Sequence, residues 1–138
     1  MKLVIDSNVF FAALLKDSNV RVVLFYGNYE FFIPAYVLQE FKEHEDELLG
    51  KTTYSREELT LIASSILQII SLIDDASIQS VMEQAKDIMD VIDRDDTPII
   101  AAALAIQADG IVTFDPHFKQ QNKIRVFDVD ELMPRGEF

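Results

Sequence analysis

The sequence predicts an α/β fold in which a mostly parallel sheet is covered by helices on both faces. Short apolar runs of strand length alternate with longer segments of helical periodicity. The body of the segment 93–106 is apolar on nearly every side, which is typical of an interior helix. The chain has 138 residues, and neither a linker nor an internal repeat divides it. Residues 1–138 are therefore expected to form one domain with a substantial core.

Strand-like and helix-like segments alternate through the first half of the chain. In order, we expect a strand at 2–5, a helix at about 8–16, an apolar segment at 20–24, a strand at 31–33, a helix at 35–49 and a helix that opens after residue 55. The polar residues 17–19 break the first helix and offer a cap for the next segment. Ser55 and Glu58 form a capping box, and isoleucines as far as Ile70 fit the inner face of the helix that follows.

The second half continues the alternation. In order, we expect a short strand at 72–73, a helix at 77–92, the interior helix after residue 96, a strand at 111–114, a strand at 124–127 and a short helix or tail from residue 128. A chain that alternates strands and helices in this way is typical of a parallel sheet, because each helix carries the chain back to the starting edge.

Charge and composition exclude several classes of protein. The chain has 12 basic and 24 acidic residues, so its formal net charge is −12, which argues against a large basic face for nucleic acid. The basic residues available for local contacts with a nucleic acid are Arg94, Lys119, Lys123 and Arg125. The absence of cysteine excludes disulfides and thiolate metal sites. No run is apolar enough to cross a bilayer, and the first residues lead into a core strand, so we expect a cytoplasmic protein without membrane contact.

Acidic residues stand where the predicted strands end or helices begin. Asp6 follows the first strand and Asp115 follows the strand at 111–114. Glu40 lies in the helix after the second strand, and Asp96 precedes the interior helix. In an open α/β sheet the carboxyl ends of the strands form the ligand crevice, so these carboxylates are expected to share one edge.

Each of these acids also has a purely structural interpretation. Asp6 and Asp96 can serve as helix caps, Glu40 can be a solvated surface acid, and Asp115 can belong to an ordinary turn. Taken together, however, crowded carboxylates repel one another, and a divalent cation removes that repulsion. A set of oxygen ligands without cysteine or a histidine pair favours Mg²⁺ or Mn²⁺ over zinc.

The pattern resembles the PIN-domain family. The matching segments are VIDSNVFFAAL at 4–14, AYVLQEF at 35–41, DRDDTPIIAAAL at 93–104 and GIVTFDPHF at 110–118, in the order of the family. The resemblance implies a three-layer α/β/α sandwich, Rossmann-like, with a central parallel sheet. It also implies an Mg²⁺- or Mn²⁺-dependent ribonuclease, a homodimer and, as in the VapC group, a toxin with an antitoxin partner. The acids of the family fall on Asp6, Glu40, Asp96 and Asp115 in this sequence.

Other positions of the motif need separate interpretation. The polar residue that orients the site in the family falls on Asn8, which can equally be a helix cap. Many relatives carry a further Asp two positions after the last acid, where this chain has His117. That change lowers the local negative charge and is expected to weaken a second metal. Asp93 and Asp95 precede Asp96, and Asp93 is a possible substitute or additional ligand.

Two hypotheses for function remain open at this stage. The first is a metal-dependent endoribonuclease, in which Asp6 and Asp96 bind metal directly and Asp115 binds a second ion directly or through water. In that mechanism Glu40 orients the attacking water or contacts a metal. The alternative is a catalytically weak or inactive PIN-like module that binds RNA or protein. The strongly acidic composition and His117 favour the alternative slightly.

Overall fold

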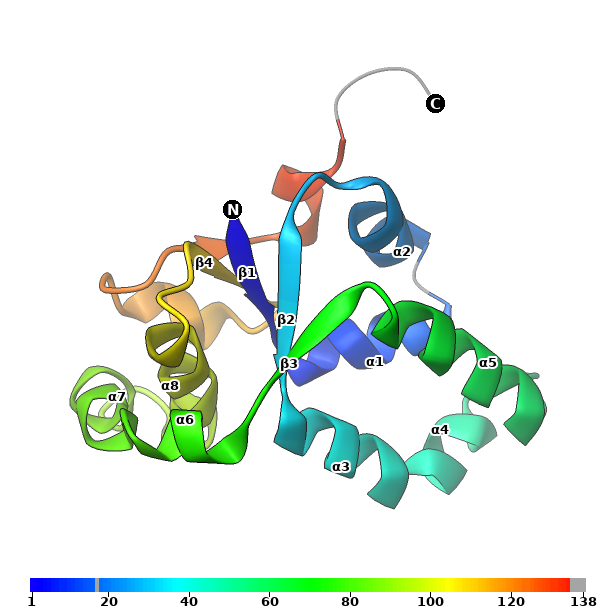
Figure 1. Cartoon of the computed structure of the whole chain (residues 1–138), viewed down its shortest axis with the longest axis horizontal. Coiled ribbons are helices and arrows are strands. Elements are labelled where there is room, and N and C mark those ends of the chain that lie inside the picture. Colours follow the sequence, from blue (N-terminus) through cyan, green and yellow to red (C-terminus); the bar gives the residue numbers. More distant parts are fainter. Residues whose placement is uncertain (17, 135–138) are drawn as a thin grey trace.

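A five-stranded sheet lies at the centre of the computed structural model, which describes residues 1–16 and 18–134 (Figure 1). The strands are β1 (Lys2–Ile5), β2 (Glu30–Pro34), β3 (Ile70–Ile73), β4 (Gly110–Val112) and β5 (Val126–Phe127). They are all parallel and lie in the order β3-β2-β1-β4-β5. Asp17, part of the predicted break at 17–19, and the end of the predicted tail at 135–138 lie outside the described residues.

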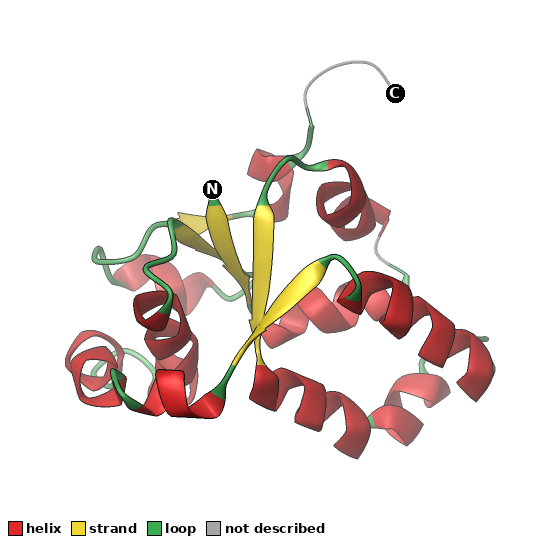
Figure 2. Ribbon diagram, viewed as in Figure 1, coloured by secondary structure: helices red, strands yellow, loops and turns green. Residues whose placement is uncertain are grey.

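Helices cover both faces of the sheet (Figure 2). The α-helices are α1 (Ser7–Leu15), α2 (Ser18–Tyr26), α3 (Ala35–Glu43), α4 (Glu45–Gly50), α5 (Arg56–Leu67), α6 (Asp75–Gln79), α7 (Met82–Met89) and α8 (Thr97–Ala105). Short 3₁₀ turns are η1 (Arg94–Asp96), η2 (Pro116–Gln120) and η3 (Val129–Leu132). The arrangement is the predicted three-layer α/β/α sandwich, and the parallel sheet is confirmed.

The core has two halves, one on each side of the sheet. Alternate residues of β1 supply both halves, because successive side chains of a strand point to opposite faces: Leu3 and Ile5 pack with α1, α2 and α5, whereas Val4 packs with α6, α7 and α8. The predicted interior helix is confirmed as α8, in which residues 99–103 are buried. Within the described residues no helix combines the length and the apolar character that crossing a bilayer requires.

Two segments predicted as single helices are each divided. The segment 35–49 breaks at His44, whose φ of −108° and ψ of 15° are not helical, and α4 then begins with three acids. Acidic side chains are favoured at a helix N-terminus, which explains a new start at this point. The segment 77–92 breaks at Ser80 and Val81. The Ser80 hydroxyl donates to the Ser77 carbonyl at 2.6 Å and so competes with the helical hydrogen bonds.

Other boundaries also differ from the sequence prediction. The capping box of Ser55 and Glu58 is confirmed, but α5 ends at Leu67, so Ile70 belongs to β3 and not to the helix. The strand predicted at 111–114 is Gly110–Val112, and the strand predicted at 124–127 is Val126–Phe127. Polar side chains accept backbone N–H groups just outside these strands: Asn8 accepts that of Phe114, and Gln121 accepts that of Ile124.

Candidate functional site

Asp6 lies at the carboxyl end of the central strand β1 and caps α1. Its Oδ1 accepts the N–H of Ser7 at 2.8 Å, and its backbone N–H donates to the carbonyl of Val112 in the neighbouring strand at 3.0 Å. The residue is only 6% exposed. Burial raises the pKa of Asp6 above its usual value, and the charge of Asp115 raises it further, against the hydrogen bonds from Thr113 and Ser7. Asp6 is thus both a helix cap and a buried carboxylate whose ionised form is disfavoured.

Thr113 connects Asp6 to Asp115. Its hydroxyl donates to Asp6 Oδ2 at 2.7 Å and accepts the backbone N–H of Asp115 at 3.0 Å. These contacts exist because β1 and β4 are adjacent and parallel, so their carboxyl ends meet. Thr113 is 1% exposed, and its bond to Asp6 is buried. The two acids predicted to be neighbours at strand ends do lie together.

Asp96 ends η1 and directly precedes α8. Its Oδ2 atom is buried and accepts no hydrogen bond within the described part of the chain. Burial raises the pKa of Asp96 to about 8, and a proton shared with Asp115 together with the charges of Asp115, Asp93 and Asp6 adds to the rise. The pKa of Asp115 lies below its ordinary value although burial acts to raise it. Three contacts lower this pKa: the backbone N–H of His117, the proton of Asp96 and the charge of His117.

A cleft of about 530 Å³ opens at this edge of the sheet, and Asp6, Glu40 and Asp96 all line it. Burial raises the pKa of Glu40, and so does the charge of Asp6. Glu40 is therefore part of the cleft and not only a solvated surface acid. Tyr36 lies in the same cleft, where burial and the surrounding carboxylates raise the pKa of its phenol far above its usual value.

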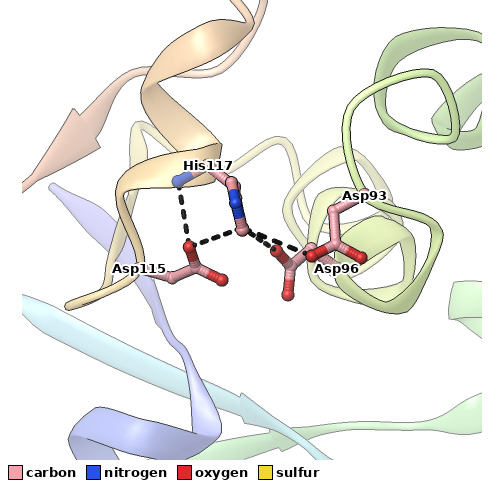
Figure 3. A group of neighbouring side chains, drawn as sticks. All are labelled: Asp93, Asp96, Asp115 and His117. Carbon is pink, nitrogen blue, oxygen red and sulfur yellow. Dashed lines mark hydrogen bonds and ion pairs between the residues drawn. The ribbon is translucent and has the colours of Figure 1, made fainter.

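A second group of side chains adjoins the cleft (Figure 3). Asp93, Asp96, Asp115 and His117 each offer a potential ligand atom, and these atoms lie within 4.8 Å of one another. His117 Nδ1 lies 3.0 Å from Asp115 Oδ1, 3.3 Å from Asp93 Oδ2 and 3.9 Å from Asp96 Oδ2. His117 therefore faces the acids, and is more than a solvated residue of a surface turn. Asp95 is exposed and lines the cleft instead.

Asn8 and the predicted basic residues take different places. Asp6, not Asn8, is the N-cap of α1, and Asn8 Oδ1 accepts the N–H of Phe114 at 3.5 Å. Asn8 thus ties α1 to the loop that carries Asp115. Lys119 forms an ion pair with Asp128 at 2.9 Å, and the guanidinium of Arg125 lies 4.4 Å from the centre of the Phe127 ring. Both basic side chains already have partners within the protein.

The residues present fit a divalent cation. The donors are carboxylate oxygens, which suit hard ions, and one of them is the buried, unbonded Oδ2 of Asp96. Without a cation, the charge of Asp115 raises the pKa of both Asp6 and Asp96. The potential ligand atoms that lie close enough together to share one ion belong to Asp93, Asp96, Asp115 and His117.

Sequence reasoning missed Tyr36 and Thr113. Thr113 was recognisable only as a polar residue at the end of a buried strand, just before Asp115. Tyr36 follows Pro34 by two positions, in the segment predicted as a helix at 35–49, and it was given no role. Its position in the cleft depends on how α3 leaves the sheet, which periodicity does not reveal.

Comparison with known proteins agrees with this architecture. No curated protein sequence matches the chain. Among solved structures, the chain is similar to one in the crystal structure of VapBC2 from Rickettsia felis bound to a DNA fragment from their promoter. The two share 19% sequence identity with a TM-score of 0.68, over 93% of this chain and 98% of that chain, which shows a common fold. The family model of the PIN domain matches residues 4–122. This match spans most of the 138 residues, and the chain belongs to the PIN-domain family.

Proposed function

We propose that this protein is an endoribonuclease that hydrolyses RNA phosphodiesters with the help of Mg²⁺ or Mn²⁺. The observation that carries the proposal is the convergence of Asp6, Glu40, Asp96 and Asp115 at one edge of the sheet, from four separate segments of the chain. Carboxylates crowded in this way, three of them with raised pKa values, are costly unless a cation binds them. Nuclease activity is general in the PIN-domain family, to which the chain belongs.

In this reaction, different side chains bind the cation, orient the attacking water and position the loop of Asp115. Asp6, Asp96 and Asp115 hold the cation, which when bound supplies Lewis-acid stabilisation of the charge that develops on the phosphate. Glu40, whose pKa is raised by burial and by the charge of Asp6, orients the attacking water and accepts its proton. Asn8 positions the loop of Asp115 through the N–H of Phe114.

The charge of the chain restricts how RNA is held. With a net charge of −12, the protein repels a polyanion over most of its surface. Binding of RNA therefore depends on the cations in the cleft and on few basic side chains. A shallow dependence of RNA affinity on salt is the expected consequence.

The proposal extends to the biological setting. We take residues 1–138 as a single PIN-like domain acting in the cytoplasm, as a homodimer, and as the toxin of a pair whose antitoxin is a separate protein. Support comes from the likeness to a chain of the VapBC2 complex. Exposed apolar side chains such as Phe25 on α2 and Leu61 on α5 offer surface for such assembly.

The test is RNA cleavage by purified protein. Labelled single-stranded RNAs are incubated with Mn²⁺ or Mg²⁺ and with wild type, Asp6→Asn or Asp96→Asn. Asp109→Asn is the matched control, because Asp109 lies at the opposite edge of the sheet, where it accepts the N–H of Lys2. We expect wild type and Asp109→Asn to cleave and the other variants to lose at least about two orders of magnitude in rate. Cleavage that survives both Asp6→Asn and Asp96→Asn would overturn the assignment.

One observation favours a second candidate function. His117 contacts Asp93 and Asp115 and neutralises part of the acidic group when it is protonated. A PIN-like module that binds RNA or protein with little or no turnover fits that arrangement. Binding of RNA without cleavage, across many RNAs and with either metal, would identify it.

A further inference from the structure

We propose that His117 is a nitrogen ligand of a divalent ion held with Asp93, Asp96 and Asp115, and that this position selects Mn²⁺ or another first-row transition ion over Mg²⁺. The inference rests on the proposed function only in taking this edge of the sheet as a metal site. It concerns which ion is bound and by which atoms, and it is tested without RNA.

The geometry places the imidazole among the carboxylates. His117 Nδ1 lies 3.0, 3.3 and 3.9 Å from oxygens of Asp115, Asp93 and Asp96. Ligands bound to one ion at about 2.1 Å are separated from one another by roughly 3.0 Å when adjacent and 4.2 Å when opposite. These separations therefore fall in the range of a single coordination sphere. Figure 3 shows the imidazole of His117 between Asp115 on one side and Asp93 and Asp96 on the other.

Two short turns hold the ligands from opposite sides. On one side, Asp115 caps η2 and its Oδ1 accepts the backbone N–H of His117 at 2.9 Å. On the other side, Asp93 caps η1 through the N–H of Asp95 at 3.0 Å, and Asp96 ends the same turn. Backbone N–H groups thus fix the carboxylates of Asp115 and Asp93 before any ion arrives, which reduces the entropy cost of binding.

The buried oxygen of Asp96 argues for a ligand and against a simple counter-ion role of His117. A counter-ion to these acids is expected to satisfy the most buried of them. Instead Asp96 Oδ2, which accepts no hydrogen bond within the described residues, is the most distant of the oxygens from the imidazole. A cation between the two groups supplies the contact that the imidazole does not make.

The donor set determines the preference for the ion. Mg²⁺ requires oxygen ligands and parts reluctantly with its waters, whereas imidazole nitrogen suits manganese, cobalt and zinc. An aspartate at position 117 would complete an all-oxygen set suited to Mg²⁺. The histidine found there shifts the affinity towards transition ions.

The experiment measures metal binding by the metal-free protein. Calorimetric titration compares Mg²⁺ with Mn²⁺ in wild type, His117→Ala and His117→Asp. We expect wild type to bind Mn²⁺ at least tenfold more tightly than Mg²⁺, His117→Ala to lose about tenfold in Mn²⁺ affinity, and His117→Asp to bring the two ions closer together. A ratio of Mn²⁺ to Mg²⁺ affinity that is the same in all three proteins would overturn the inference.

The second histidine provides an internal control. The chain has two histidines, and His44 lies at the junction of α3 and α4, 3.3 Å from Glu47. In proton NMR spectra with Zn²⁺ as a diamagnetic probe, the ring resonances of His117 should shift at one equivalent while those of His44 do not. Equal shifts of both rings would mean adventitious surface binding and would contradict the proposal.

The outcomes separate this inference from the proposed function. Coordination by His117 without any RNA cleavage supports the inference and removes the nuclease proposal. RNA cleavage that Mg²⁺ supports as well as Mn²⁺, and that His117→Ala leaves unchanged, supports the nuclease and overturns the inference. Circular dichroism of both variants establishes that they are folded, which the half-exposed position of His117 favours.

Discussion

Among the acids of the cleft, Asp96 is the one whose pKa is raised most. Its pKa is raised from 3.8 to about 8, chiefly by burial and then by Asp115, Asp93 and Asp6. The metal-free folded protein therefore holds a proton there that the unfolded chain releases at much lower pH. Folding opposes ionisation of this residue, and a bound cation reverses that preference.

The raised pKa of Asp96 makes the stability of the folded protein depend on pH. Between about pH 4 and pH 8 the folded state binds more protons at Asp96 than the unfolded state does, so the free energy of unfolding falls as the pH rises through that interval. We expect Asp96→Asn, which cannot ionise, to lack this contribution. Thermal unfolding in EDTA should show Asp96→Asn more stable than wild type at pH 8 and nearly equal to it at pH 4. Parallel curves for the two proteins would contradict the raised pKa.

The hydroxyl of Thr113 is a second residue-scale determinant. Thr113→Val keeps the shape but removes the donor to Asp6 Oδ2 and the acceptor for the N–H of Asp115. We expect a loss of about 1–3 kcal/mol in the free energy of unfolding, because buried polar groups are left unpaired. Urea denaturation measures it, with Thr113→Ser as the control that retains the hydroxyl. A valine variant as stable as the serine variant would show that the bridge is unimportant.

At the scale of elements, the contact between β4 and β5 leaves no room for a side chain at Gly110. A Cβ there would lie 2.5 Å from Phe127 Cε2 and 2.9 Å from the carbonyl oxygen of Arg125. Phe127 is 4% exposed, so its ring is packed within the core. The close approach of the two strands therefore requires glycine, and β4 carries the chain to Thr113 and Asp115.

Gly110→Ala tests this contact. We expect it to lower the free energy of unfolding by about 1–3 kcal/mol, as overpacking of a filled core does. Gly50→Ala is the control, because a Cβ at Gly50, the last residue of α4, meets nothing within 4 Å. That change is expected to be neutral or to stabilise by up to about 1 kcal/mol. Equal stabilities of the two variants in chemical denaturation would refute the steric argument.

The sequence predicted whether a segment is a helix or a strand where its apolar residues are regularly spaced. It did not predict where these elements begin and end. The interior helix α8 and the strand β1 followed from their apolar runs. The breaks at His44 and Ser80 did not, because the apolar spacing continues across both and only a local backbone turn interrupts the helix. Ile70 fits a helix face and a strand equally well, and its pairing with Phe31 of β2 decided for the strand.

The candidate site was predictable in part for a related reason. Acids at strand ends converge whenever the strands are parallel and adjacent, so Asp6 and Asp115 needed only the fold class. The contact of His117 with Asp93 joins two turns, η1 and η2, whose separation depends on how α8 packs against the sheet. No local pattern encodes that distance.

For the molecule as a whole, divalent cations should act as stabilising ligands. Binding only to the folded state, at about 100 times the dissociation constant, adds roughly 2.7 kcal/mol. For a chain of this size that corresponds to a rise in melting temperature of roughly 10 °C. We expect the rise with Mg²⁺ or Mn²⁺ in wild type and in Asp109→Asn, and its loss in the double variant Asp6→Asn/Asp96→Asn. Scanning fluorimetry measures it, and an unmoved transition in wild type at millimolar metal would argue against a shared site.

The burial of α8 couples the cleft to the interior of the protein. Asp96 directly precedes this helix, and Ala101, Ala102 and Ala103 within it are fully enclosed between the sheet and α7. A helix packed so closely does not shift alone, so a larger side chain at any of these alanines displaces the carboxylate as well. Random mutagenesis that selects for inactive clones should therefore recover substitutions at these alanines as well as at the acids. Buried residues that no substrate contacts thus limit which sequences can keep the carboxylate in place.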